Sequence, residues 1–73
     1  MPGLPCVSGE RVVRAFQKAG WVKDQQHGSH VILIKPSSQA SLSVPLHREV
    51  APGTLRSLIR ASEMTVAQFA ELL

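Results

Sequence analysis

Three consecutive residues, Gly28, Ser29 and His30, offer the most promising chemistry in the sequence. The imidazole of histidine changes its charge near neutral pH, so it can accept or donate a proton during a reaction. Glycine gives the backbone the freedom for a tight turn, and the apolar run 31–34 that follows is typical of a strand. The pattern therefore predicts a histidine fixed at the end of a sheet, with one side open to solvent.

No carboxylate partner lies beside His30 in the sequence. RNA cleavage is a reaction that such a histidine can still catalyse. RNA carries its own nucleophile, the 2′-hydroxyl, and the protein needs only to move protons and stabilise charge on the phosphate. His47 follows the last predicted strand and can face the same edge as His30. We take His47 and Gln26 as auxiliary candidates. The candidate phosphate ligands are Gly28, Ser29, Lys23, Lys35 and Arg48.

Other kinds of site have weaker support. The plain alternative for each histidine is a structural or solvated side chain without a chemical role. Three histidines and Cys6 are enough in number for a tetrahedral zinc site, but no pair has a familiar ligand spacing. We also predict that His27 and His30 point to opposite faces of a strand. Ser29 lacks the glycine pattern of a nucleophile elbow, so we expect no metal, no cofactor and no serine nucleophile.

The helices that must hold this site have readable start and stop signals. The first helix is expected over about 8–19, because Ser8 is a good N-cap and Gly20 suits a C-terminal cap. A second helix begins near Pro52, a residue favoured in the first helical turn. The spacing of Thr65 and Gln68 is that of a capping box, which predicts the start of a third helix.

Three short strands are expected between the first and second helices, at 21–26, 29–35 and 40–45, with turns at 27–28 and 36–39. The sequence therefore predicts an α+β fold in the order α-β-β-β-α-α. In this fold, a three-stranded antiparallel sheet has its helices on one face. Residues 1–7 are rich in proline and glycine and are expected to form a flexible N-terminal arm, which leaves 8–73 as a single domain.

The second strand is apolar at every position from 31 to 34. A sheet with helices on one face only would leave some of these side chains exposed. An exposed apolar face commonly marks a partner surface or a contact between copies of the chain. We favour a partner or a homo-oligomer; the alternative is that the C-terminal helix or the N-terminal arm folds over this face.

Composition limits the remaining possibilities. The chain has 73 residues and a net charge of +3, a mild excess that is compatible with phosphate binding but does not establish it. Its single cysteine, Cys6, cannot form an internal disulfide, which is typical of intracellular proteins. No apolar run approaches the roughly 20 residues that a membrane span requires, and we see no signal peptide. We expect a cytoplasmic protein.

Four short motifs resemble those of one known family. They are Ala-Gly-Trp at 19–21, Gln-His-Gly-Ser-His at 26–30, Val-Pro-Leu-His at 44–47 and Pro-Gly-Thr-Leu-Arg-Ser-Leu-Ile at 52–59. In order and spacing they are similar to the motifs of the HicA toxins. The resemblance covers about 8–73, and although each motif alone is weak, four in register are specific.

The resemblance implies an mRNA interferase, the toxin of a type II toxin–antitoxin pair that acts in a stress response. It implies a fold similar to a double-stranded-RNA-binding domain, a catalytic histidine at His30, and an antitoxin of the HicB type that covers the site. Many HicA toxins carry an arginine just before the glutamine of the second motif, where this chain has Gln25. This departure keeps open a second reading, an RNA-binding module that does not cut. A third is a protein-interaction domain without RNA contact.

Overall fold

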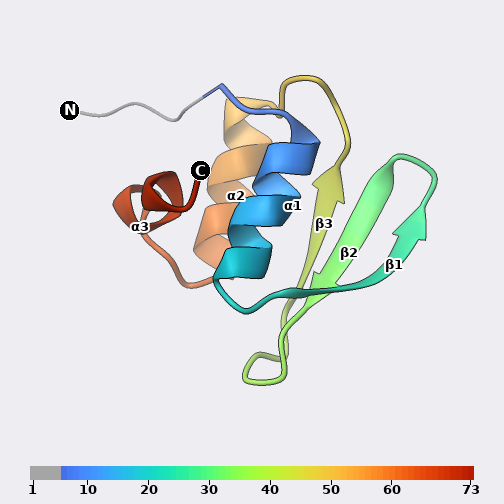
Figure 1. The fold of residues 1–73 in the computed structure, drawn as a ribbon, viewed down its shortest axis with the longest axis vertical. Helices are drawn as coiled ribbons and strands as arrows, with labels where there is room; N and C mark the ends of the chain where they lie inside the picture. Colours follow the sequence, from blue (N-terminus) through green and yellow to red (C-terminus); the bar gives the residue numbers. More distant parts are fainter. Residues whose placement is uncertain (1–5) are drawn as a thin grey trace.

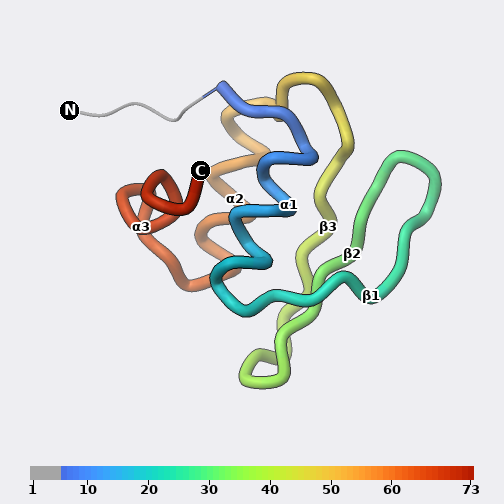
Figure 2. The backbone as a smooth tube through the Cα atoms, in the orientation of Figure 1, coloured from blue at the N-terminus to red at the C-terminus, as the bar shows by residue number. Residues whose placement is uncertain are grey.

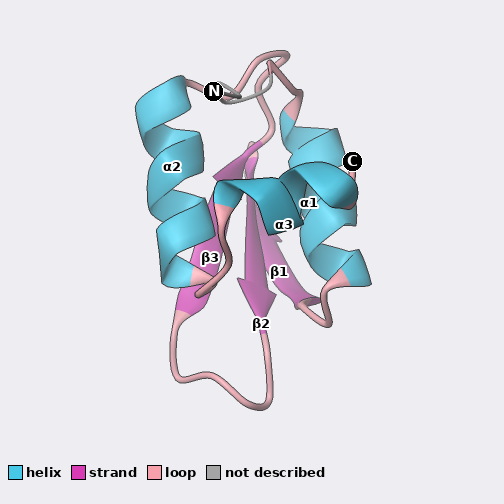
Figure 3. Ribbon diagram, turned by 90° about the vertical axis from the view of Figure 1, so that its left-hand side faces the viewer, coloured by secondary structure: helices cyan, strands magenta, loops and turns pink. Residues whose placement is uncertain are grey.

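The predicted order of elements is confirmed in a computed structural model, which describes residues 6–73 (Figure 1). Both strand pairs are antiparallel, and the strand order in the sheet is β1-β2-β3. All three helices cover the same face of the sheet, with α3 lying across α1 and α2 (Figure 3). The elements are α1 (Gly9–Lys18), β1 (Val22–His27), β2 (His30–Ile34), β3 (Ser41–Pro45), α2 (Pro52–Ala61) and α3 (Val66–Glu71).

Helix α1 is closed at both ends by the residues that the sequence predicts. The Ser8 hydroxyl accepts a hydrogen bond from the backbone N–H of Arg11, which satisfies one of the free donors of the first turn. At the other end Gly20 has a φ of 102°, and its N–H and that of Trp21 donate to carbonyls of the last turn. This is a Schellman motif, and it turns the chain directly into the sheet.

The turn between β1 and β2 lies one residue later than predicted. It consists of Gly28 and Ser29, and Gly28 has the φ of 58° that the first position of a type II′ hairpin turn requires. His27 is therefore the last residue of β1 and pairs with His30 across the turn. The prediction of a turn at 27–28 is wrong, because a two-residue loop of this kind places glycine first.

A bulge in β1 decides which side chains face the helices. The register shifts between Lys23, which pairs with Leu33, and Gln25, which pairs with Ile32. The extra residue, Asp24, breaks the alternation of faces. As a result Lys23 and Gln26 lie on the same face of the hairpin as the buried residues Leu33 and Val31, although a regular strand would separate them.

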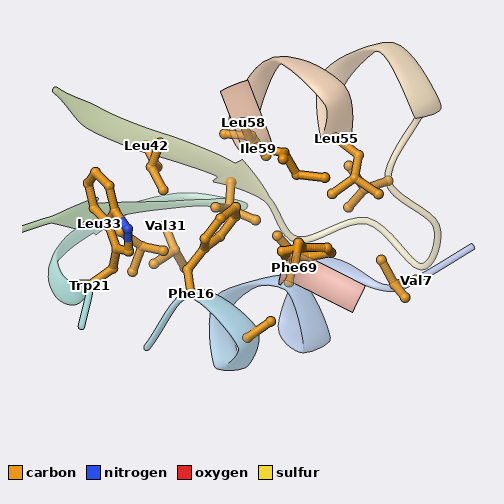
Figure 4. Packing of buried hydrophobic residues seen from close by; sticks show 14 residues of the cluster. Val7, Phe16, Trp21, Val31, Leu33, Leu42, Leu55, Leu58, Ile59 and Phe69 are labelled. Carbon is orange, nitrogen blue, oxygen red and sulfur yellow. The ribbon is translucent and has the colours of Figure 1, made fainter. Parts of the chain in front are cut away.

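The core lies between the sheet and the helices (Figure 4). Val31 pairs with Val44 and Leu33 with Leu42, and all four side chains are buried. The rings of Phe16 on α1 and Phe69 on α3 pack with centroids 5.1 Å apart, so that α3 is joined to the first helix through the core. The capping box predicted from the sequence starts α3, since the Thr65 side chain and backbone exchange hydrogen bonds with Gln68.

The opposite face of the sheet carries exposed apolar side chains, as predicted. Val22 is 54% exposed, and Ile34, with which it pairs, is 41% exposed. Ile32, on the same face of β2, is half-buried. Neither α3 nor any other part of residues 6–73 covers this face (Figure 1). No helix among the described residues is both long and apolar enough to cross a membrane.

The N-terminal arm lies mostly outside the described residues, which begin at Cys6. Val7 is buried, and its carbonyl accepts a hydrogen bond from the backbone N–H of Val50. The packed domain therefore includes Val7, one residue before the boundary that the sequence suggests.

Candidate active site

The predicted catalytic residue lies at an end of the sheet where two loops meet. His30 is the first residue of β2 and pairs with Pro45, the last residue of β3. Just beyond Pro45, the backbone N–H of Leu46 donates a hydrogen bond of 2.6 Å to the carbonyl of Ser29. This bond holds the segment after β3 against the turn before β2, and it brings His47 next to His30.

The two imidazole rings form an exposed pair. The ring centroids of His30 and His47 lie 6.5 Å apart, and the ring planes meet at 71°. Both residues are exposed. Two groups that can each carry a proton thus stand together at the surface, which is the arrangement needed to serve two oxygens of a single phosphodiester.

The first residue of helix α1 holds the backbone of His47 in place. The backbone N–H of Gly9 donates a 2.9 Å hydrogen bond to the His47 carbonyl, so the start of α1 lies against the chain that leaves β3 (Figure 2). A Cβ atom on Gly9 would collide with the carbonyl oxygen of Pro45 and would lie 2.7 Å from Cα of Leu46. Only glycine allows this approach. The sequence analysis missed this role, because it arises from a contact between distant segments and leaves no local signal.

The register corrects the predicted orientation of His27. Directly paired residues of antiparallel strands point to the same face, and His27 pairs with His30. The two side chains therefore share the open face of the sheet, and the prediction of opposite faces is wrong. Gln25 pairs with Ile32 and lies on this face as well, so it is on the same side of the sheet as His30.

The predicted cations are not all brought together. Arg48 is exposed and directly follows His47, at the same end of the sheet. Lys35 follows the far end of β2, roughly 16 Å from His30 along the strand. Its Nζ lies 5.9 Å from the ring centroid of Trp21, where it covers a buried aromatic side chain. Nothing in this arrangement brings Lys35 near a phosphate held at His30.

Lys23 and Gln26 join the site through a chain of hydrogen bonds on the helix side of the hairpin. Lys23 Nζ donates a 3.0 Å bond to Gln26 Oε1, and Gln26 Nε2 donates a 3.0 Å bond to the carbonyl of Gly28. Gln26 thus braces the turn that presents His30. Lys23 reaches this turn only through Gln26, which the bulge at Asp24 makes possible.

The other reactive groups to place are potential metal ligands and the Cys6 thiol. Residues 6–73 contain no cluster of three or more His, Cys, Asp or Glu side chains that could hold a metal ion. Cys6 is exposed, and the Glu49 carboxylate raises the pKa of its thiol, first through a hydrogen bond and then through its negative charge. A raised pKa lowers the fraction of reactive thiolate at neutral pH.

A comparison with known protein families identifies the family of the chain. The family described as "HicA toxin of bacterial toxin-antitoxin" matches residues 9–64, which is more than half of the chain. The chain belongs to the HicA toxin family. The matched region runs from the first residue of α1 to just before α3, and it contains both histidines of the exposed pair. Among curated proteins, no sequence matches this one.

Membership confirms the family resemblance that the four motifs indicate. This HicA toxin is accordingly the toxin component of a toxin–antitoxin system, and an antitoxin is its implied partner. Its helix–three strands–two helices arrangement also matches that of double-stranded-RNA-binding domains, as the resemblance implies.

Proposed function

We propose that this HicA toxin is a metal-independent endoribonuclease that cleaves mRNA in the cytoplasm, with His30 as its catalytic residue. The observation that carries the proposal is the exposed pair of His30 and His47, whose ring centroids are 6.5 Å apart. A pair of imidazoles supports transesterification of RNA, because that reaction requires one proton acceptor and one proton donor and no nucleophile from the protein.

The proposed reaction balances without a cofactor. One imidazole, in its neutral form, takes the proton of a ribose 2′-hydroxyl as the 2′-oxygen attacks the adjacent phosphorus. The bond between phosphorus and the 5′-oxygen of the next nucleotide breaks, and the second imidazole, in its charged form, gives that oxygen a proton. The products are a 2′,3′-cyclic phosphate and a 5′-hydroxyl end. His30 takes one of these two roles and His47 serves as its auxiliary in the other.

Charge on the phosphate is stabilised in this proposal from two sides. Arg48 supplies a guanidinium beside His47, and such a group forms charge-assisted hydrogen bonds with phosphate oxygens. Gly28 and Ser29 are exposed in the turn before His30 and offer nearby polar groups. Gln26 braces the turn through the Gly28 carbonyl. These residues would position the substrate while the histidines move protons.

The test is cleavage of a labelled RNA by purified variants. His30→Ala should lose at least about 100-fold in rate and His47→Ala about 10-fold or more, since a positioned acid or base contributes roughly 100- to 10,000-fold. His27→Ala is the matched control, a histidine of the same hairpin and the same face, and it should keep its rate within about threefold. Equal rates for the wild type and His30→Ala would refute the proposal.

The chemistry has two further signatures. A 2′-deoxy substitution at the cut site should abolish cleavage, because it removes the nucleophile. Excess chelator should leave the rate unchanged, because no step requires a metal. Loss of activity in chelator, restored by a divalent cation, would contradict the mechanism, as would products with a 5′-phosphate.

A second candidate function is RNA binding without cleavage, and Gln25 favours it. The side chain lies on the face of His30, at the position where many HicA toxins carry arginine, so this chain lacks a cation that could contact phosphate there. Gln25→Arg should raise RNA affinity, with a steeper dependence on salt, because an added cation releases one more counterion on binding. If the wild type binds RNA but cuts none, and Gln25→Arg restores cutting, the chain is a weakened member of its family.

The antitoxin, which we propose to be of the HicB type, would cover the histidine pair. The exposed apolar residues Val22 and Ile34 on the same face suit either such a partner or a second copy of the toxin. Sedimentation of the toxin alone and with its antitoxin distinguishes the two. Self-association that is lost in Ile34→Thr would support the homo-oligomer, and a monomer that binds antitoxin less tightly after the same substitution would support the partner.

A further inference from the structure

A cleft between α1 and the β1–β2 hairpin is not used by the mechanism above. Its volume is about 340 Å³, near the lower limit for sites that bind small molecules. It opens on the helix side of β1, the face to which the bulge at Asp24 turns Lys23 and Gln26. The lining consists of Glu10, Val13, Arg14, Gln17, Lys23, Gln26, Val31 and Leu46.

The lining divides into an apolar part and a polar part. Val13, Val31 and Leu46 are buried or half-buried aliphatic side chains. The remaining lining residues are exposed and include two amides, two cations and one carboxylate. A nucleobase has the same division, with apolar ring faces and a polar edge of donors and acceptors. Unpaired bases of RNA are recognised in this way, by packing against their faces and hydrogen bonding to their edges.

The amide of Gln26 is already fixed for such recognition. Its Oε1 accepts from Lys23 Nζ and its Nε2 donates to the Gly28 carbonyl, both at 3.0 Å. A primary amide has two N–H groups and two acceptor lone pairs, so one donor and one acceptor remain on a side chain whose orientation is set. That combination matches the edge of a base, and because it is oriented in advance, binding loses little entropy.

The cleft and the histidine pair lie on opposite faces of the hairpin, at the end that carries the turn at Gly28. Leu46 lines the cleft, and the next residue is His47. On the hairpin, the pair Gln26 and Val31 that lines the cleft adjoins the pair His27 and His30. An RNA strand that passes around the turn at Gly28, from one face of the hairpin to the other, would have a phosphate at the histidines and a neighbouring base at the cleft.

We propose that this cleft binds a nucleobase of the RNA substrate next to the cleaved phosphodiester and sets the base preference of the toxin. Gln26 and Gln17 read the base edge, Arg14 and Lys23 hold the flanking phosphate, and the aliphatic side chains contact the base face. The inference rests on the proposed nuclease function, and it adds the part of the substrate that determines where cutting occurs.

The first experiment measures cut-site preference on an RNA pool with every base at each position around the cut. The wild type should favour one or two bases at a single position. Gln17→Ala should reduce that preference by about fivefold or more while total cutting falls less, because the histidines are untouched. Gln39→Ala is the matched control, since Gln39 is an exposed amide in the loop between β2 and β3, and it should leave the preference unchanged.

The second experiment needs no catalysis, so it separates this inference from the proposed function. The side-chain amide signals of Gln17 and Gln26 are followed by NMR in the full chain as each of the four ribonucleoside 5′-monophosphates is added. We expect saturable shifts of these two amides, larger for one base, that Arg14→Ala weakens by about threefold or more. Amide shifts in a protein that cleaves no RNA would refute the proposed nuclease function but support nucleobase binding in the cleft.

Two results would overturn the inference. One is that none of the four nucleotides shifts the two amides at millimolar concentration. The other is that Gln17→Ala cuts with the same base preference as the wild type. A nucleotide that shifts the Gln39 amide as strongly as those of the cleft would also count against it, because the interaction would then be general.

Discussion

The contact of Gly9 with the end of β3 gives the sharpest test of how this fold holds its site. Gly9→Ala adds one methyl group at the first residue of α1, where the Cβ would collide with the Pro45 carbonyl oxygen and lie 2.7 Å from Cα of Leu46. Both neighbours are backbone atoms, so neither can move away by a simple rotation. The start of the helix and the segment that carries His47 must separate.

The expected cost follows from two effects. Overpacking of one methyl group against rigid neighbours costs about 1–3 kcal/mol, and the loss of the hydrogen bond from Gly9 N–H to the His47 carbonyl adds about 1 kcal/mol. Alanine recovers up to about 1 kcal/mol through its higher helix propensity. With the full gain of alanine counted, the net loss is about 1–3 kcal/mol, a large part of the roughly 3–5 kcal/mol that stabilises a domain of this size.

Urea unfolding followed by tryptophan fluorescence measures this loss. Trp21 is the only tryptophan and is buried, so its emission reports the folded state. Gly53→Ala is the matched control, because Gly53 lies in the first turn of α2 and a Cβ there meets no atom within 4 Å. It should be neutral or slightly stabilising. A Gly9→Ala protein within about 0.5 kcal/mol of the wild type would refute the close-approach argument.

Three further outcomes are expected. Thr65→Ala removes the capping box of α3 and should lower the free energy of unfolding by about 1 kcal/mol in the same urea assay, and an unchanged midpoint would count against the cap. Lys35→Ala should change Trp21 emission but keep RNA cleavage within about twofold, because Lys35 lies at the far end of β2. A large loss of cleavage would show that Lys35 does act in the site. Glu49→Gln should speed alkylation of Cys6 at pH 8, because Glu49 raises the thiol pKa and its removal increases the thiolate fraction. Equal rates would contradict that pairing.

Local signals were sufficient to predict most of the fold. Ser8, Gly20 and Thr65 act on atoms within a few residues of themselves, and their predicted roles as helix caps are confirmed. The exposed apolar face was predictable too, because a strand that is apolar on both sides cannot bury both against a single layer of helices. Kinship with the HicA toxins followed from four motifs in register.

The arrangement of the site was less predictable, because it depends on register. The bulge at Asp24 turns Lys23 and Gln26 to one face. No residue pattern near Asp24 indicates that a bulge occurs there. The turn begins at Gly28 and not His27, so the two histidines of the hairpin share a face. Lys35 is near the Gly28–His30 motif in the sequence, but the extended backbone of β2 carries it away by about 3.3 Å per residue.

The hydrogen bonds from Leu46 to Ser29 and from Gly9 to His47 join three parts of the chain that are distant in sequence. Neither histidine is held by its own strand alone, so the pair exists only when α1, the hairpin and the end of β3 have all folded. The free energy of unfolding of a domain this size is about 3–5 kcal/mol. A partly synthesised or unfolded chain would contain both imidazoles, but they would not be held together. If the pair is the catalytic centre proposed above, activity would begin only on folding, and a protease that cuts the unfolded chain would prevent it without recognising the site.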